Sequence, residues 1–231
     1  QKTLETAFTK AFVTVFEKGS GLIEKTYRKQ RHERLFREHE RDIHKEGFNG
    51  KSLRRFERQA KRTVAKNLTI TTVEGIGFGI VGLGIPDIPI FVSVMLKSIY
   101  EIALSYGFSY STDKEKLFIL KLIDAALKSG ETLRKKDKDM NKLIRRYFEE
   151  EETAEAETDP FVVELQIKRQ IDSSAEALSH ELLYGKFLQG STFIGVIGGT
   201  ADFTCLKRIT DYATLKYKRR FLLRQLPETM D

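Results

Sequence analysis

The amino-acid sequence predicts an all-α protein, a helical bundle with two glycine-rich apolar helical hairpins at its centre. Its 231 residues include only four prolines and no tryptophan. Apolar residues recur at steps of three and four rather than alternating. Glycine gathers in two apolar segments, which indicates close approach of backbones. The chain is long enough to bury a full core, and we expect a single helical domain over residues 1–231.

Positive charge is concentrated in the first third of the chain. The net charge is +7 overall. Residues 1–72 carry 18 Lys and Arg against 9 Asp and Glu, whereas residues 73–231 carry 22 against 24. This basic third predicts an anionic partner, which is a membrane surface, a nucleic acid or an acidic protein.

The first two helices are predicted over residues 4–27 and 28–45. Three phenylalanines on one apolar stripe of the first helix favour core packing over a ligand site. The second helix is highly charged and is expected to be exposed, with i,i+4 ion pairs. Its histidines, His32, His39 and His44, stand seven and five residues apart. Because this spacing does not gather them around one ion, we predict solvated histidines and no metal site.

A basic amphipathic helix is predicted over residues 51–68, after a turn at Asn49-Gly50. Its buried stripe is expected to be Leu53, Phe56, Ala60, Val64 and Leu68. Its other faces carry the residues predicted to bind lipid or a partner, which are Arg54, Arg55, Arg58, Lys61, Arg62 and Lys66. Such a helix suits contact with a membrane surface or a nucleic acid, or serves only as a solvated face. With Phe56 in the core, no ring is offered to bases, so nucleic acid is the less favoured partner.

The stretch over residues 74–108 is the predicted centre of the bundle. Five glycines, at positions 75, 77, 79, 82 and 84, are followed by the sequence PDIP at 86–89. Asp87 is predicted to cap the next helix, with Pro89 in its first turn and Gly107 just past its end. Apolar residues between them have helical spacing, and Glu101 and Ser105 are expected on the outer faces.

This stretch also raises the question of a transmembrane segment. Residues 75–96 contain one charge in 22 residues, which is nominally enough to span a bilayer. Asp87 near the centre would cost roughly 2.5–3.5 kcal/mol even on the lenient insertion scale. We therefore favour a buried hairpin of a soluble bundle over one that dips into the membrane, and a true span least.

Three further helices are predicted in the second half. Thr112 and Glu115 form a capping box that opens a helix ending near Gly130. Amphipathic periodicity continues over residues 131–150 and again over 161–183. The acidic, low-complexity run between them, at residues 149–160, is predicted to be an exposed linker.

A second glycine-rich apolar segment, at residues 188–201, leads to Asp202, a last helix and a basic cluster at 216–224. This order repeats that of the first half and suggests two related hairpins, with Asp87 and Asp202 at equivalent helix starts. Two facing carboxylates can share a proton, hold a metal or act as acid and base. Helix capping explains each aspartate without such chemistry and is the favoured interpretation.

Motifs of known enzyme classes are absent from the sequence. It contains no nucleophile elbow, zinc-protease helix, phosphate loop or cysteine pair. The glycines at 75, 77 and 79 resemble a dinucleotide fingerprint only superficially, since no strand precedes them. No cofactor is predicted. The single cysteine, Cys205, and the lack of a visible signal peptide favour a cytoplasmic protein.

Several segments resemble the EcsC family of bacterial proteins. They are GIPDIP (84–89), IYEIA (99–103), YG (106–107), GGTAD (198–202) and KRRFL (218–222). The likeness covers roughly residues 50–225. The family is named for a protein encoded beside an ABC transporter, so the resemblance implies a cytoplasmic or membrane-peripheral helical protein. It supplies no catalytic residues.

The favoured hypothesis is a non-enzymatic, membrane-peripheral or ABC-transporter-associated accessory protein whose basic helix contacts anionic lipid. One alternative is a peptidase-like hydrolase that uses Asp87 and Asp202. The other is a nucleic-acid-binding protein that uses the basic N-terminal third.

Overall fold

The computed structural model describes residues 1–18, 23–78, 87–153, 160–188 and 198–225, with side chains at all of these except 17–18, 68–78, 87, 151–153, 160, 184–188 and 198–202. Within the described ranges there are eight α helices and no strand, so the predicted all-α class is confirmed. The helices are α1 (Lys2–Lys18), α3 (Lys29–Glu46), α4 (Gly50–Phe78), α5 (Asp87–Ser105), α6 (Asp113–Ala126), α7 (Gly130–Thr153), α8 (Pro160–Leu188) and α9 (Gly198–Gln225).

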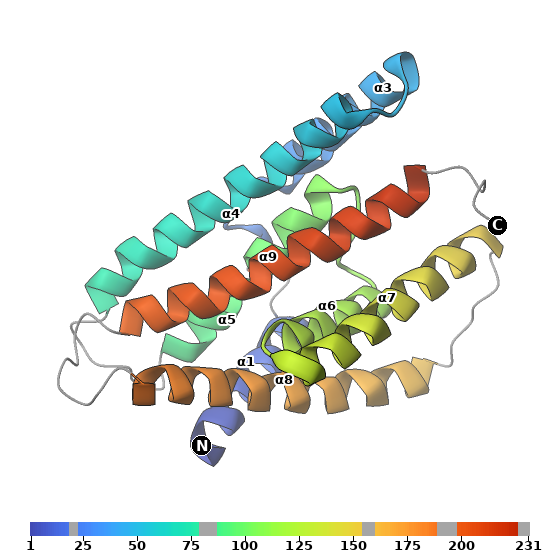
Figure 1. Cartoon of the computed structure of the whole chain (residues 1–231). Helices are drawn as coiled ribbons and strands as arrows, with labels where there is room; N and C mark the ends of the chain where they lie inside the picture. The colour runs from blue at the N-terminus through green and yellow to red at the C-terminus, as the bar shows by residue number, and fades with distance from the viewer. Residues whose placement is uncertain (19–22, 79–86, 154–159, 189–197, 226–231) are drawn as a thin grey trace.

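Helix α5 is the centre of the bundle, because it packs against α1, α3, α4 and α9. Helix α8 packs against α1, α6 and α9. Figure 1 shows α4 and α9 running side by side, with the paired α3 and α4 along the upper edge of the molecule. Helices α3 and α4 of the basic N-terminal third therefore form one side of the bundle, whereas α1 packs against α5 and α8.

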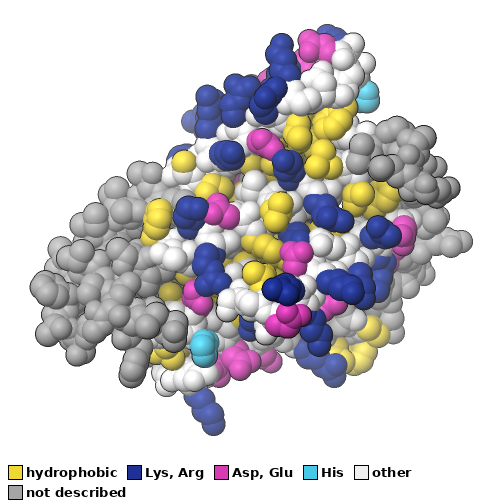
Figure 2. All heavy atoms as spheres, viewed as in Figure 1, with side chains coloured by type: hydrophobic (Ala, Val, Ile, Leu, Met, Phe, Trp, Pro, Cys, Tyr) yellow, Lys and Arg dark blue, Asp and Glu magenta, His cyan; other side chains and the backbone are white. Residues whose placement is uncertain are grey.

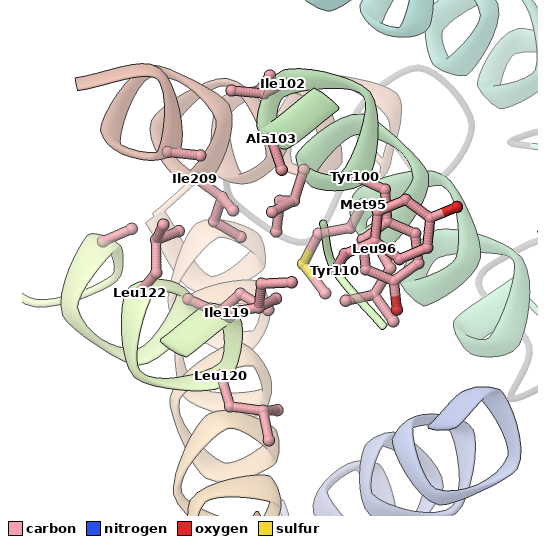
Figure 3. Packing of buried hydrophobic residues seen from close by; sticks show 14 of the residues in the cluster. Met95, Leu96, Tyr100, Ile102, Ala103, Tyr110, Ile119, Leu120, Leu122 and Ile209 are labelled. Atoms are coloured by element: carbon pink, nitrogen blue, oxygen red, sulfur yellow. The ribbon is translucent and has the colours of Figure 1, made fainter. Parts of the chain in front are cut away.

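The core is built from the apolar stripes that the sequence predicts. Figure 3 shows Met95, Leu96 and Ala103 of α5 near Ile119 of α6 and Ile209 of α9. All five are fully buried. Each large apolar side chain buried in this way contributes about 1.5–3 kcal/mol to folding, as an upper estimate.

The end of α5 confirms the role predicted for Gly107. Its φ is +79°, which lies in the left-handed region that favours glycine. The Phe108 amide donates to the Ala103 carbonyl at 2.9 Å, and the Gly107 amide donates to the Leu104 carbonyl at 3.2 Å. These two bonds form a Schellman motif, which satisfies carbonyls at the helix end.

The predicted capping box at the start of α6 is half confirmed. Thr112 Oγ1 accepts a hydrogen bond from the Glu115 amide at 3.2 Å. The Glu115 carboxylate instead binds Tyr217 and Arg220 of α9. The local rule therefore locates the helix start, whereas a tertiary contact takes the acidic side chain.

Several helices are longer than predicted. Helix α4 continues to Phe78 through Gly75 and Gly77, and α9 begins at Gly198. Helix α7 runs to Thr153, so the predicted linker at 149–160 begins too early. Helix α1 is described over Lys2–Lys18, and residues 19–22 of the helix predicted over 4–27 lie outside the described residues. Residues 79–86 and 189–197, the centres of the two predicted hairpins, lie outside the described residues.

One described helix is long and apolar enough to cross a membrane by length and composition. It is the window Ile88–Ser105 of α5, with mean hydropathy 1.5. However, 67% of that window is buried inside the protein. A core helix of a bundle has this composition, which agrees with the position of α5 among four neighbours.

Candidate functional site: a basic cleft between two helices

The start of α4 is fixed by Asn49, where the sequence predicts only a turn. Asn49 Oδ1 accepts from the amides of Lys51 at 2.9 Å and Ser52 at 3.0 Å. Ser52 Oγ in return accepts from the Asn49 amide at 3.0 Å. This reciprocal cap sets the position from which the basic face of α4 begins.

The buried stripe of α4 is as predicted where the structure describes it. Phe56, Ala60 and Val64 are buried and Leu53 is partly buried, whereas the side chain of Leu68 lies outside the described residues. The opposite faces hold the six predicted binding residues. Five of the six are exposed: Arg54, Arg58, Lys61, Arg62 and Lys66. Arg55 is partly buried and pairs with Asp42 of α3.

Four of these six residues line a cleft of about 330 Å³ between α3 and α4. Arg54 and Lys61 are not among its lining residues. The lining is Arg31, His32, Leu35 and His39 of α3, Arg55, Arg58, Gln59, Arg62, Thr63 and Lys66 of α4, and Glu101 of α5. Five cationic side chains therefore surround a space that contains one carboxylate. Figure 2 shows Lys and Arg side chains gathered over α3 and α4 at the upper edge of the molecule.

Glu101 is the residue of this cleft that sequence reasoning missed. It was expected on an outer face, but it is 4% exposed, and Ser105 is fully buried. Helices α3 and α4 cover that side of α5. The available signal was its position in a run of otherwise apolar residues, because a helix that is apolar on nearly all faces is an interior helix.

The Glu101 carboxylate is held from both sides. Asn67 Nδ2 of α4 donates to Oε2 at 2.5 Å, and His32 Nε2 of α3 lies 3.3 Å from Oε1. Asn67 is 2% exposed and the His32 side chain is 13% exposed. The prediction of a solvated His32 is therefore wrong. Glu101 ties the two helices of the cleft to the central helix.

Three lining residues carry buried polar atoms that have no hydrogen-bond partner among the described residues. They are His32 Nδ1, His39 Nδ1, and both Gln59 Nε2 and Gln59 Oε1. Buried polar atoms are nearly always paired, and leaving one unpaired costs about 1–3 kcal/mol. Three such side chains around one cleft provide donors and acceptors that a bound molecule can pair with.

His39 gives the cleft region a pH dependence. It lies edge-on to Phe56, with ring centroids 5.1 Å apart, and is partly buried rather than solvated as predicted. Burial and the nearby Arg55 guanidinium lower the pKa of the His39 imidazole below its ordinary value. The folded protein therefore holds His39 neutral at neutral pH.

We expect the free energy of unfolding to fall as the pH drops below about 6.5, the ordinary pKa of histidine. Below that pH the imidazole of the unfolded chain binds a proton, whereas the His39 imidazole of the folded protein stays neutral. The stability that His39 contributes at neutral pH is therefore lost as the pH falls from the ordinary pKa of histidine to the lowered pKa of folded His39. Urea denaturation from about pH 7.5 to about pH 5.5, where few carboxylates titrate, measures it. His39→Phe should flatten the profile, and His44→Asn at an exposed position should not. Parallel profiles for His39→Phe and the wild type would contradict this assignment.

A second cluster of charges lies in the core, between α6 and α9. Arg220 Nη1 contacts the two Glu115 carboxylate oxygens at 2.7 and 2.9 Å, and Tyr217 Oη donates to Oε1 at 2.6 Å. The guanidinium also lies over the rings of Phe108 and Phe118, at 4.2 and 4.5 Å from their centroids. With all these partners buried, the cluster is a structural link. The basic cluster at 216–224 is thus partly interior, which the sequence did not reveal.

The predicted aspartate pair is placed only by its backbone. Asp87 is the first described residue of α5, whereas Asp202 is the fifth residue of α9 and not at its start. Both side chains lie outside the described residues, so the pairing of their carboxylates stays a prediction. Among the described side chains, no group of three His, Cys, Asp or Glu is placed to hold a metal ion.

The fold and the cleft define a class of protein: an all-α bundle with a central apolar helix and a cationic surface cleft beside it. The chain belongs to the EcsC protein family, whose family model matches residues 1–222. Protein EcsC of Bacillus subtilis (strain 168) is 30% identical to it over 74 residues, which are 31% of this chain and 31% of that protein. The match thus spans about a third of the relative's length. No solved structure matches the chain.

Proposed function

We propose that the protein is a non-enzymatic, membrane-peripheral accessory protein that contacts anionic lipid through the basic face of α4. The observation that carries the proposal is a stripe of exposed cations, Arg54, Arg58 and Lys61, one turn apart along that helix. None of the three forms an ion pair with a described carboxylate. Each such cation near an anionic surface contributes about 1 kcal/mol to binding.

The charge balance of α4 differs from that of the other Lys- and Arg-rich helix, α7. Between residues 50 and 67, α4 has seven cations and only Glu57 as an acid, and Glu57 pairs with Lys218 of α9 at 2.5 Å. Helix α7 has seven cations and seven acids over its length. The positive charges of α7 are therefore balanced by acids on the same helix, whereas α4 presents a net positive electrostatic potential to its surroundings.

Liposome flotation tests the proposal. We expect recovery with vesicles that contain anionic lipid and none with zwitterionic vesicles. The variant R54Q/R58Q/K61Q should reduce the partition coefficient by roughly 100-fold, which corresponds to about 3 kcal/mol. The matched control K138Q/K142Q/R145Q, which removes three exposed cations of α7, should stay close to the wild type. Equal, negligible recovery on both lipids, or equal losses in the two variants, would overturn the proposal.

The same experiment bears on the nucleic-acid alternative. Phe56 is fully buried, so the described part of α4 offers no aromatic ring for base stacking. Retention on DNA or RNA that declines steeply with salt, without lipid binding, would favour that alternative. An ABC transporter as the membrane partner stays a prediction that rests on the family.

A further inference from the structure

We propose that the cleft between α3 and α4 binds a phosphomonoester group, carried either by a lipid headgroup or by a small soluble molecule. The proposal goes beyond the surface contact described above. It concerns the side of α4 that carries Arg55, Gln59, Arg62 and Lys66, which shares Arg58 with the surface stripe, and it adds residues of α3. A membrane is one source of such a group and is not required for the site to exist.

The charges of the cleft call for an anion. Arg55 has Asp42 as its partner, and Glu101 is already bound by Asn67 and His32. The remaining lining cations, Arg31, Arg58, Arg62 and Lys66, have no ion pair with a described carboxylate. Like charges gathered from two helices repel one another, so an anion between them would lower the energy of the folded protein.

The number of cationic donors in the cleft favours a phosphate over a carboxylate. A phosphomonoester carries a charge of about −1.5 to −2 at neutral pH and three terminal acceptor oxygens. Guanidinium groups donate to such oxygens in pairs, and three arginines other than Arg55 line the cleft. One singly charged carboxylate would leave most of these donors without a partner.

The uncharged residues favour a ligand that has more than a phosphate. Gln59 has both a donor and an acceptor without partners, and His32 and His39 each have one ring nitrogen without a partner. Hydroxyl groups, which donate and accept, would complement these atoms. The volume of about 330 Å³ is at the small end of ligand sites, which fits one headgroup or one small phosphorylated polyol.

The first arm of the test uses soluble probes. Isothermal titration calorimetry is carried out with glycerol 3-phosphate, with inorganic phosphate, and with glycerol as the uncharged comparison. We expect binding of the phosphorylated probes only. The variant R31Q/R62Q, at exposed positions of the two helices that form the cleft, should weaken binding by roughly tenfold or more. The matched control R54Q/K61Q removes two exposed cations outside the cleft and should bind as the wild type does.

The second arm uses vesicles of matched surface charge that contain either phosphatidic acid, a phosphomonoester, or phosphatidylglycerol, a phosphodiester. A preference for phosphatidic acid that is lost in R31Q/R62Q and kept in R54Q/K61Q supports the lipid source. Binding of soluble probes without any vesicle binding supports the soluble source and contradicts the proposed function.

Other results would overturn the phosphomonoester site and leave the proposed lipid contact of α4 standing. Equal binding to both anionic vesicles, together with no soluble binding, overturns the phosphomonoester site and leaves the surface contact in place. Equal losses in the cleft variant and the control also overturn it. Gln59→Leu, which leaves the charge unchanged, should weaken the polyol phosphate more than inorganic phosphate. An unchanged far-ultraviolet circular dichroism spectrum and melting temperature confirm that each variant is folded.

Discussion

Replacing Arg220 with methionine is expected to lower the free energy of unfolding by about 3–5 kcal/mol. The Arg220 side chain is 7% exposed and binds both carboxylate oxygens of Glu115, whose side chain is 6% exposed. Removing it leaves a buried negative charge whose remaining hydrogen bond comes from Tyr217. A lone buried charge is costly because the interior cannot solvate it.

Thermal and urea denaturation measure this effect, and the melting temperature should fall by roughly 10 °C. Arg219→Met is the matched control, since the neighbouring side chain is exposed and its loss should change stability by less than about 0.5 kcal/mol. The double variant E115M/R220M should recover most of the loss, because no charge is then left buried. Equal stability of Arg220→Met and Arg219→Met would show that the buried pair does not hold α6 against α9.

Replacing Gly107 with alanine is expected to cost about 2–4 kcal/mol, from two separate causes. With φ at +79°, an L side chain pays roughly 1–2 kcal/mol for the left-handed backbone. The added methyl carbon would also lie 2.2 Å from Cζ of Phe36, which forces overpacking. The Phe36 ring has little room to retreat, since it packs against Phe56 and Phe221 at centroid distances of 5.7 and 6.5 Å.

Gly130 provides the matched control for this substitution. Its φ is +55°, and a Cβ added there would meet nothing within 4 Å. Gly130→Ala should therefore show only the backbone cost of about 1–2 kcal/mol. Measured in a Phe36→Ala background, Gly107→Ala should lose its steric part and approach the Gly130→Ala value. Equal effects at the two glycines in the wild-type background would mean that the contact with Phe36 is not tight.

Hydrogen-bonded caps at helix ends were well predicted from the sequence. Gly107 ends α5, and Thr112 caps α6. The buried stripe of Phe56, Ala60 and Val64 was also correct. Such features depend on hydrogen bonds and contacts within about four residues, so a short window of sequence contains all the information they need.

Apart from the helix bounds, the errors concern the burial and partners of ionisable residues. Glu101 was expected outside and is buried, and His32 and His39 were expected in solvent and are partly covered. The Glu115 carboxylate was expected to turn back on its own helix, but it binds Arg220 of α9. In each case a partner distant in the sequence decides whether a polar or charged side chain can be buried. The periodicity of apolar residues does not identify that partner.

The candidate site was likewise predicted only in part from the sequence. Helical periodicity and the excess of cations predicted the basic helix and the residues Arg55, Arg58, Arg62 and Lys66, because both are visible without a fold. The cleft itself arises only when α3 places Arg31 and His32 opposite them and α5 closes the floor with Glu101. By itself, therefore, the sequence determined an all-α chain with a basic N-terminal third. Tertiary packing decided which of its charges face one another, since that depends on helices brought together from distant parts of the chain.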